Sequence, residues 1–313
     1  MHLLQVTDLS VARLHALFDV AARLKQRPAS RAKALKGKVL ALIFQKPSLR
    51  TRVSFEVAVR RLGGSTCYLG PDDAQLGDRE PIKDVARTLS RYVDGIILRT
   101  FRHAQVEECA AYASVPVING LSDVHHPCQA LADLLTIRER FGRLAGLTLS
   151  YVGDGNNVLH SLLQGASLLG VHMAVATPPG YRPQAAIWRQ AARAAKAHGA
   201  RLSWSRDPAE AVRNADVVYT DVWTSMGQEQ ERQARQRAFR GFQVNGRLLA
   251  GANRQAIVMH CLPAHRGEEI SEEVVDGPRS VVFDQAENRL HVQQALLILL
   301  YTRHSSLVTR KAP

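Results

Sequence analysis

Short runs of apolar residues alternate along this chain with segments of helical periodicity. Each run is nearly continuous in apolar residues and is bounded by Gly, Pro or Asp, which is typical of strands covered on both faces. Strand and helix in alternation predict an α/β fold with parallel, doubly wound sheets. The expected strands are 38–44, 95–99, 115–119, 147–154, 171–178, 215–222, 256–263 and 280–285. The expected helices include 52–63, 84–93, 127–142 and 185–199.

The length of 313 residues suits two domains. The chain has no low-complexity linker and no internal repeat, and a boundary is expected at the Gly-rich segment 142–146. We therefore predict two domains, 1–142 and 143–288, each with a mostly parallel sheet flanked by helices. Residues 289–313 contain a last apolar helix, which is expected to pack back on the first domain. Because open α/β sheets bind ligands at the carboxyl ends of their strands, we expect an active site in the cleft between the domains.

Composition excludes several classes of protein. Apolar residues make up 46% of the chain and charged residues 22%, which is typical of a globular protein and not of a disordered or coiled-coil one. No run reaches the ~18–20 apolar residues of a membrane span. The segment 1–14 has no basic start followed by an apolar core, so no secretory signal is recognised. We therefore expect a soluble, cytoplasmic protein with no membrane partner.

The net charge is +13, and most of the basic residues are arginines. Such a charge is compatible with nucleic acid, an acidic membrane surface or anionic metabolites as partners. Proteins that bind nucleic acid usually concentrate charge in a tail or stripe and interleave it with aromatic residues. Here the arginines are dispersed and aromatic residues make up only 6% of the chain. The densest run, Arg232–Arg240, is interpreted as a solvated helix face, and no nucleic-acid partner is expected.

The four cysteines form no CxxC pair, and their irregular spacing does not match a structural zinc site. Without an export signal, reduced thiols are expected. Cys261 lies next to His260 in HCLPAH, but adjacent residues are poorly suited to chelation. We therefore expect neither a metal nor a cofactor.

Two polar motifs open helices directly after expected strands. Ser48–Arg52 (SLRTR) combines two hydroxyls and two guanidinium groups with a helix N-terminus, which favours anions and predicts a phosphate site. It lacks the GxxxxGK(S/T) pattern of a Walker loop, and the alternative is a helix cap with solvated arginines. His126–Gln129 (HPCQ) places a histidine and an amide where both can donate to a carbonyl oxygen, although a lone histidine is more often structural.

Three further motifs follow later strands. Gly153–Ser161 (GDGNNVLHS) resembles a dinucleotide-binding turn, but it lacks the third glycine and the acidic residue on the next strand, so amide donors to a small substrate are the alternative. Asp221–Gly227 (DVWTSMG) offers a carboxylate for an ammonium group, or a helix cap. Cys261 in HCLP is a nucleophile, an amine-positioning thiol or an inert thiol. Arg289, before the last helix, is a further candidate cation.

The motifs HPCQ, DVWTSMGQE, HCLPAHRGEE and FDQAENRLH, in this order, resemble those of the aspartate/ornithine carbamoyltransferase family, in particular its ornithine-specific branch. The resemblance extends from about Asp8 to Tyr301. It implies transfer of the carbamoyl group of carbamoyl phosphate to the δ-amine of L-ornithine, giving L-citrulline and phosphate, as in arginine biosynthesis. It also implies a homotrimer or a higher multiple, with active sites shared between subunits.

The resemblance assigns each domain a substrate. Carbamoyl phosphate would bind to the first domain (1–142) and ornithine to the second (143–288), with Gln75 supplied by a neighbouring subunit. The residues implied for carbamoyl phosphate are Ser48, Leu49, Arg50, Thr51, Gln75, Arg99, His126, Gln129, Cys261, Leu262 and Arg289. Those implied for ornithine are Asn157, Asp221, Ser225 and Met226. The implied catalytic residues are Arg99, His126, Asp221 and Cys261.

The chemistry of the reaction agrees with these residue types. When an amine attacks a carbonyl, negative charge grows on the oxygen and then on the departing phosphate, and fixed cations can stabilise it without a metal. The family motif STRTR has Leu49 here in place of its first threonine, which is a departure on the phosphate side. Acetylornithine or putrescine is the alternative acceptor, and a nucleotide-dependent dehydrogenase or a binding protein is the remaining alternative.

Overall fold

The computed structural model describes residues 1–26, 33–73, 77 and 79–302. The chain divides into two compact units. Unit 1 comprises Met1–Ala132 together with the chain from Glu287 on, and unit 2 is the continuous segment Asp133–Ala286.

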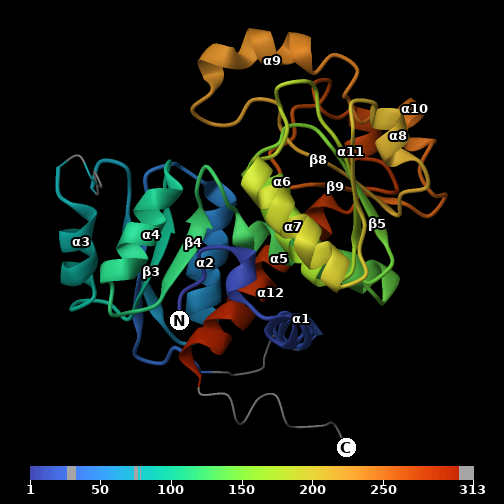
Figure 1. Ribbon diagram of the computed structural model, residues 1–313. Coiled ribbons are helices and arrows are strands. Elements are labelled where there is room, and N and C mark those ends of the chain that lie inside the picture. Colours follow the sequence, from blue (N-terminus) through green and yellow to red (C-terminus); the bar gives the residue numbers. More distant parts are fainter. Residues whose placement is uncertain (27–32, 74–76, 78, 303–313) are drawn as a thin grey trace, which may run out of the picture. The chain divides into compact units, whose positions relative to one another are not determined.

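Unit 1 contains the strands β1 (Val39–Phe44), β2 (Ser65–Leu69), β3 (Gly95–Arg99) and β4 (Val117–Leu121). They form a parallel sheet with the order β2-β1-β3-β4, so the strand order reverses between β1 and β3. Both central strands are almost fully buried, which explains their continuous apolar sequences. The helices that begin and end in this unit are η1 (Val6–Asp8), α1 (Val11–Gln26), α2 (Leu49–Arg61), α3 (Ile82–Leu89) and α4 (His103–Tyr112) (Figure 1).

Unit 2 contains the strands β5 (Thr148–Val152), β6 (His172–Ala176), β7 (Leu202–Ser205), β8 (Val217–Thr220) and β9 (Ile257–His260). The parallel order β7-β6-β5-β8-β9 reverses between β5 and β8. The neighbouring helices α6 and α7 are drawn in yellow in Figure 1. The helices that begin and end in this unit are α6 (Asn157–Leu168), α7 (Ala185–Ala197), α8 (Pro208–Val212), η2 (Glu229–Glu231), α9 (Arg232–Ala238), α10 (Gly246–Leu249) and α11 (Glu272–Val275).

Two helices carry the chain from one unit to the other. Helix α5 (Pro127–Phe141) begins in unit 1 and continues into unit 2, and α12 (Val282–Tyr301) does the reverse. Within unit 1, Asn288 accepts a hydrogen bond from Lys25 Nζ at 2.9 Å, and the Tyr301 hydroxyl donates to the carbonyl of Asp94 at 2.7 Å. These contacts tie α12, red in Figure 1, to α1 and to the segment before β3.

The prediction of parallel α/β sheets is confirmed, but that of a strand at 280–285 is wrong. Val282 already begins α12, and in this segment Ser280 forms an isolated bridge to Val258. Four consecutive apolar or small residues do not distinguish a strand from a buried helix. The edge strands β2 and β7 were missed because both are partly exposed and lack a continuous apolar run.

The division of the chain falls inside α5 and α12, at 132 and 286, whereas boundaries were expected at 142 and 288. Residues 303–313 of the expected C-terminal segment lie outside the described residues. Within the described ranges, no helix combines the length and the apolar character needed to cross a bilayer.

Candidate active site

Part of the predicted motifs follows the strands on either side of each reversal in strand order. In unit 1, Ser48–Arg52 comes after β1, and Arg99 ends β3. In unit 2, Asn156 comes after β5 and Asp221 after β8. Ligands of open α/β sheets bind at the carboxyl ends of strands where the order reverses. Each unit therefore carries one part of the predicted site, here called the unit 1 half-site and the unit 2 half-site.

Three predicted residues of the unit 1 half-site are joined by hydrogen bonds. The guanidinium group of Arg289, which is 3% exposed, donates to Thr51 Oγ1 at 2.9 Å and to Gln129 Oε1 at 2.5 Å. Thr51 belongs to α2, Gln129 to α5 and Arg289 to α12. Segments that are far apart in the sequence thus meet at one buried cation.

His126 and Arg99 belong to the same buried group of charges. Burial lowers the pKa of His126 well below its ordinary value, and the positive charges of Arg289 and Arg99 lower it further. The imidazole is therefore neutral at pH 7 and can act as a hydrogen-bond donor through a single N–H. Arg99 is 4% exposed and supplies a second buried cation.

The N-terminus of α2 contributes its backbone to the unit 1 half-site. Ser48 caps the helix, since its Oγ accepts from the backbone N–H of Thr51 at 3.3 Å. The first turn of a helix of this length carries a partial positive charge and N–H groups that favour an anion. Arg50 lies in this turn and is half-buried, whereas the side chain of Leu49 is 76% exposed. Gln75 lies outside the described residues.

The unit 2 half-site is centred on the carboxylate of Asp221, which is 4% exposed. Asn156 Nδ2 donates to Asp221 Oδ2 at 2.7 Å, and the thiol of Cys261 donates to Asp221 Oδ1 at 2.9 Å. Asn156 also caps α6, because its Oδ1 accepts from the N–H groups of Val158 and Leu159. The structure thus brings together the turns after β5, β8 and β9.

Asn156 contacts Asp221, whereas the sequence assigned ornithine to its neighbour Asn157, the first residue of α6. Sequence reasoning noted both amides but could not distinguish them, because the choice depends on which one caps the helix. Tyr151 was missed. Its hydroxyl lies 3.3 Å from Asn156 Oδ1, and its pKa is raised well above the ordinary value by burial and then by the charge of Asp221. A continuous apolar run gives no signal for such a residue.

The Ser225–Met226 turn makes hydrogen bonds to the residues that follow it. The N–H of Ser225 donates to Gln228 Oε1 at 3.1 Å, and the N–H of Gly227 donates to the carboxylate of Glu229. Met226 is 47% exposed. Across the described ranges, no hydrogen bond joins these two predicted residues to Asp221, so their role stays a prediction.

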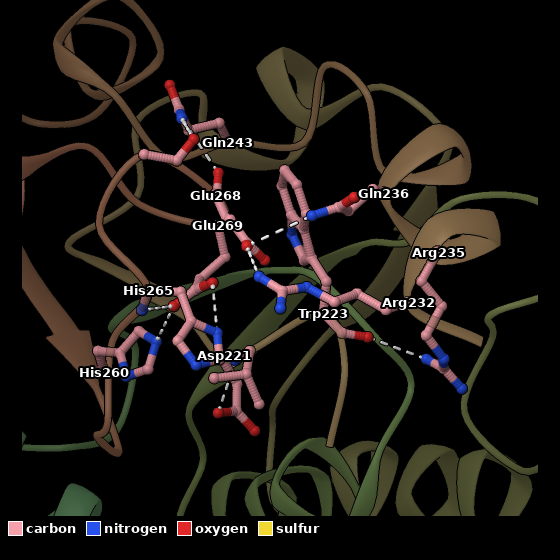
Figure 2. Close-up of polar contacts among 12 residues, drawn as sticks. Asp221, Trp223, Arg232, Arg235, Gln236, Gln243, His260, His265, Glu268 and Glu269 are labelled. Atoms are coloured by element: carbon pink, nitrogen blue, oxygen red, sulfur yellow. Dashed lines mark hydrogen bonds and ion pairs between the residues drawn. The ribbon is translucent and has the colours of Figure 1, made fainter. Parts of the chain in front are cut away.

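Helix α9 is not the wholly solvated face that was expected, because Arg235 is buried. Its guanidinium group donates to the carbonyl of Trp223 at 3.0 Å (Figure 2). It also donates to Asp154 Oδ2 at 2.9 Å. Burial raises the pKa of Asp154 to about 6, although Arg235 opposes this shift. Arg232 and Gln236 of α9 reach Glu268 instead, at 2.5 and 3.4 Å. Arg235 thus joins the turn before α6 to the segment after β8.

Asp221, His260 and Cys261 have metal-ligating atoms within 4.8 Å of one another. These atoms already take part in hydrogen bonds within the protein. The thiol donates to Asp221, and the two ring nitrogens of His260 contact the N–H of Leu262 and the carboxylate of Glu269. A metal would have to displace these contacts, so the donor set does not favour a metal.

Comparison with known proteins shows the family of this chain. The profile of the aspartate/ornithine carbamoyltransferase carbamoyl-P binding domain matches residues 1–139, and that of the Asp/Orn binding domain matches residues 145–300. Ornithine carbamoyltransferase of Gloeobacter violaceus is 56% identical over 298 residues, 95% of each chain, and that of Acidothermus cellulolyticus is 56% identical over 300 residues, 96% of each. The solved structure of ornithine carbamoyltransferase from Pyrococcus furiosus matches with a TM-score of 0.93 and 51% identity over 96% of each chain. The chain therefore belongs to the aspartate/ornithine carbamoyltransferase family.

Proposed function

We propose that this protein is an ornithine carbamoyltransferase, which transfers the carbamoyl group of carbamoyl phosphate to the δ-amine of L-ornithine and releases L-citrulline and phosphate. The observation that carries the proposal is the buried Asp221 carboxylate with its Asn156 and Cys261 partners, in a chain whose relatives at 56% identity carry this name over nearly their whole length.

The unit 1 half-site is proposed to bind carbamoyl phosphate. Arg50 and the N-terminus of α2, with Ser48 and Thr51, would hold the phosphate, and Leu49 would contribute only its N–H because its side chain is exposed. Arg99 and the single N–H of neutral His126 would donate to the carbonyl oxygen as it gains negative charge. Gln129 and Arg289 would bind the remaining side of the donor. Gln75 of a neighbouring subunit is also proposed to bind carbamoyl phosphate.

The unit 2 half-site is proposed to bind ornithine. An amine attacks only in its uncharged form, so the site must orient the δ-amine and remove a proton from it. Asp221 and Cys261 are the groups proposed for this role, with Leu262 beside them. Asn157, Ser225 and Met226 are proposed to bind the amino-acid end. The half-sites belong to different units, and both are needed because two small substrates must be held together for reaction.

A product assay tests the proposal. The full-length protein is mixed with carbamoyl phosphate and, separately, with ornithine, acetylornithine, putrescine or aspartate. Citrulline formation with ornithine, at a kcat/KM at least ~100-fold above that of the other amines, is expected, because a buried polar site discriminates strongly against substrates that leave it unpaired. Preferred use of another amine would contradict the proposal, as would the absence of turnover with all four.

We also propose a homotrimer or a higher multiple that works in the cytoplasm, in arginine biosynthesis, without nucleic acid, cofactor or metal. Sedimentation of the purified protein tests the oligomeric state. A monomer that is fully active would contradict the proposed contribution of Gln75 from a neighbouring subunit.

A further inference from the structure

The turn that carries Cys261 has an unusual backbone. Leu262 adopts a φ of +56°, in the left-handed region that a leucine seldom occupies. Such a conformation persists only where the surrounding contacts hold it. In this conformation the Cys261 thiol donates to Asp221.

His260 supplies one of the holding contacts, and the geometry fixes its tautomer. The N–H of Leu262 lies 2.9 Å from Nδ1 of His260. Because a backbone N–H can only donate, Nδ1 is the acceptor, and a neutral ring then carries its proton on Nε2. Nε2 lies 3.1 Å from Glu269 Oε1 and donates to it.

Glu269 is placed to select this tautomer. Its side chain and that of His260 are both fully buried, and its Oε1 also accepts from the N–H of His265 at 2.6 Å. Figure 2 shows the carboxylate between the two histidines. With the proton on Nδ1 instead, the ring would face the N–H of Leu262 donor to donor, and the hydrogen bond that holds the turn would be lost.

We propose that Glu269 and His260 are positioning residues for the Cys261 thiol. Glu269 keeps the imidazole proton on Nε2, Nδ1 then holds the N–H of Leu262, and the turn keeps the thiol against Asp221. Neither residue touches a reacting atom. The proposal rests on the proposed function only where it takes this thiol to face the amine of ornithine.

The test measures Cys261 directly by its rate of alkylation with iodoacetamide, without substrate. A thiol that donates to a carboxylate reacts slowly, since its ionisation would place two anions in contact. The experiments use the Cys67→Ser protein, because Cys67 is the exposed cysteine. Burial raises the pKa of Cys109 and of Cys128 to about 12, so both react slowly. Alkylation is assigned by mass spectrometry of peptides.

Two amide substitutions of His260 form a matched pair. An Asn side chain at position 260 places an acceptor where Nδ1 of the histidine lies, so it retains the hydrogen bond to the N–H of Leu262. A Gln side chain at this position places its amide near the position of Nε2, so it retains the hydrogen bond to Glu269 but loses the one to Leu262. His260→Gln is expected to speed alkylation about tenfold and to raise KM for ornithine about tenfold, with KM for carbamoyl phosphate unchanged. For His260→Asn, the alkylation rate and the KM values for ornithine and carbamoyl phosphate are expected to stay within about twofold of the parent. His198→Asn, at an exposed position, controls for the loss of a histidine.

Equal alkylation rates for the Asn and Gln variants would overturn the proposal. If His260→Gln does not fold, Glu269→Ala and Glu269→Gln form the second pair. Glu269→Ala removes the acceptor for the Nε2–H of His260 and should speed alkylation of Cys261. Glu269→Gln retains an oxygen acceptor and should leave the alkylation rate unchanged. Equal alkylation rates for these two variants would again overturn the proposal. A parent enzyme that does not use ornithine would contradict the proposed function, but the alkylation rates would still decide the positioning role.

Discussion

Burial affects two residues of the unit 1 half-site differently. His126 loses its charge, because its pKa is lowered by burial and by two neighbouring guanidinium groups. Arg289 is buried to a similar degree but stays charged, since a guanidinium group does not lose its proton in a protein and here has two oxygen acceptors. The half-site therefore contains permanent cations beside a neutral donor. This combination suits a substrate with an anionic group and a polar carbonyl.

Arg50→Ala is expected to lower kcat/KM for carbamoyl phosphate by about 100-fold or more, as loss of a preorganised donor commonly does. Arg50 is half-buried in the first turn of α2, and its loss should leave the core unchanged. Steady-state kinetics test the first point, and an unchanged midpoint of thermal unfolding tests the second. Near-normal kinetics would contradict the phosphate assignment.

His126 also predicts a dependence of stability on pH. Its pKa is lower in the folded protein than the value of about 6.5 in the unfolded chain. The unfolded chain therefore takes up the proton first, and stability is lost as the pH falls below about 6.5, by at most about 1.4 kcal/mol per pH unit. Urea unfolding of the wild type and of His126→Gln at pH 7.5 and 5.5 tests this. The wild type should lose more stability between these pH values, and equal losses would contradict the prediction.

At the scale of elements, α9 shows how one helix supports a site that it does not enter. Arg235 holds the turn before α6 through Asp154 and the segment after β8 through the carbonyl of Trp223. Both segments lead to residues of the Asp221 cluster. The helix therefore positions the two turns that carry Asn156 and Asp221.

Arg235→Gln is expected to lower the free energy of unfolding by about 3–5 kcal/mol, because it leaves the buried Asp154 carboxyl without its cation. It should also raise KM for ornithine more than KM for carbamoyl phosphate. Arg237→Gln is the matched control, since Arg237 lies on the same helix and is exposed. Equal effects of the two substitutions in denaturant unfolding would contradict the role of Arg235.

The central strands and the motifs after them could be predicted from the sequence, because strands buried on both faces consist of continuous apolar runs. The edge strands β2 and β7 could not, since partial exposure interrupts that pattern. The contacts of Asn156 and Arg235 could not be predicted for another reason. Their roles depend on Asp221 and Asp154, which lie 65 and 81 positions away in the chain, and local sequence carries no signal for such pairing.

For the whole molecule, the repeated reversal of strand order is the main organising feature. In each sheet the strand order reverses between two central strands. A group of chemically distinct side chains lies at the carboxyl ends of these strands. Cations collect there in unit 1 and a carboxylate in unit 2. A separate substrate for each unit is the simplest use of this arrangement.

Carbamoyl phosphate is expected to stabilise the protein by about 2.7 kcal/mol at 100 times its dissociation constant, because it binds the folded state only. Thermal unfolding with and without the ligand measures this. The stabilisation should disappear in Arg50→Ala and persist in Asp221→Asn, whose substitution lies in the other unit. Loss of stabilisation in Asp221→Asn alone would contradict the assignment of the donor to unit 1.

The return of α12 has a consequence for synthesis on the ribosome. Unit 2 is one uninterrupted stretch of chain, but unit 1 includes residues from Glu287 on, among them the guanidinium group that joins Thr51 to Gln129. Unit 1 is thus the first to be translated and the last to be completed. A nascent polypeptide released before codon 289 lacks a cation of the unit 1 half-site, however long it is given to fold.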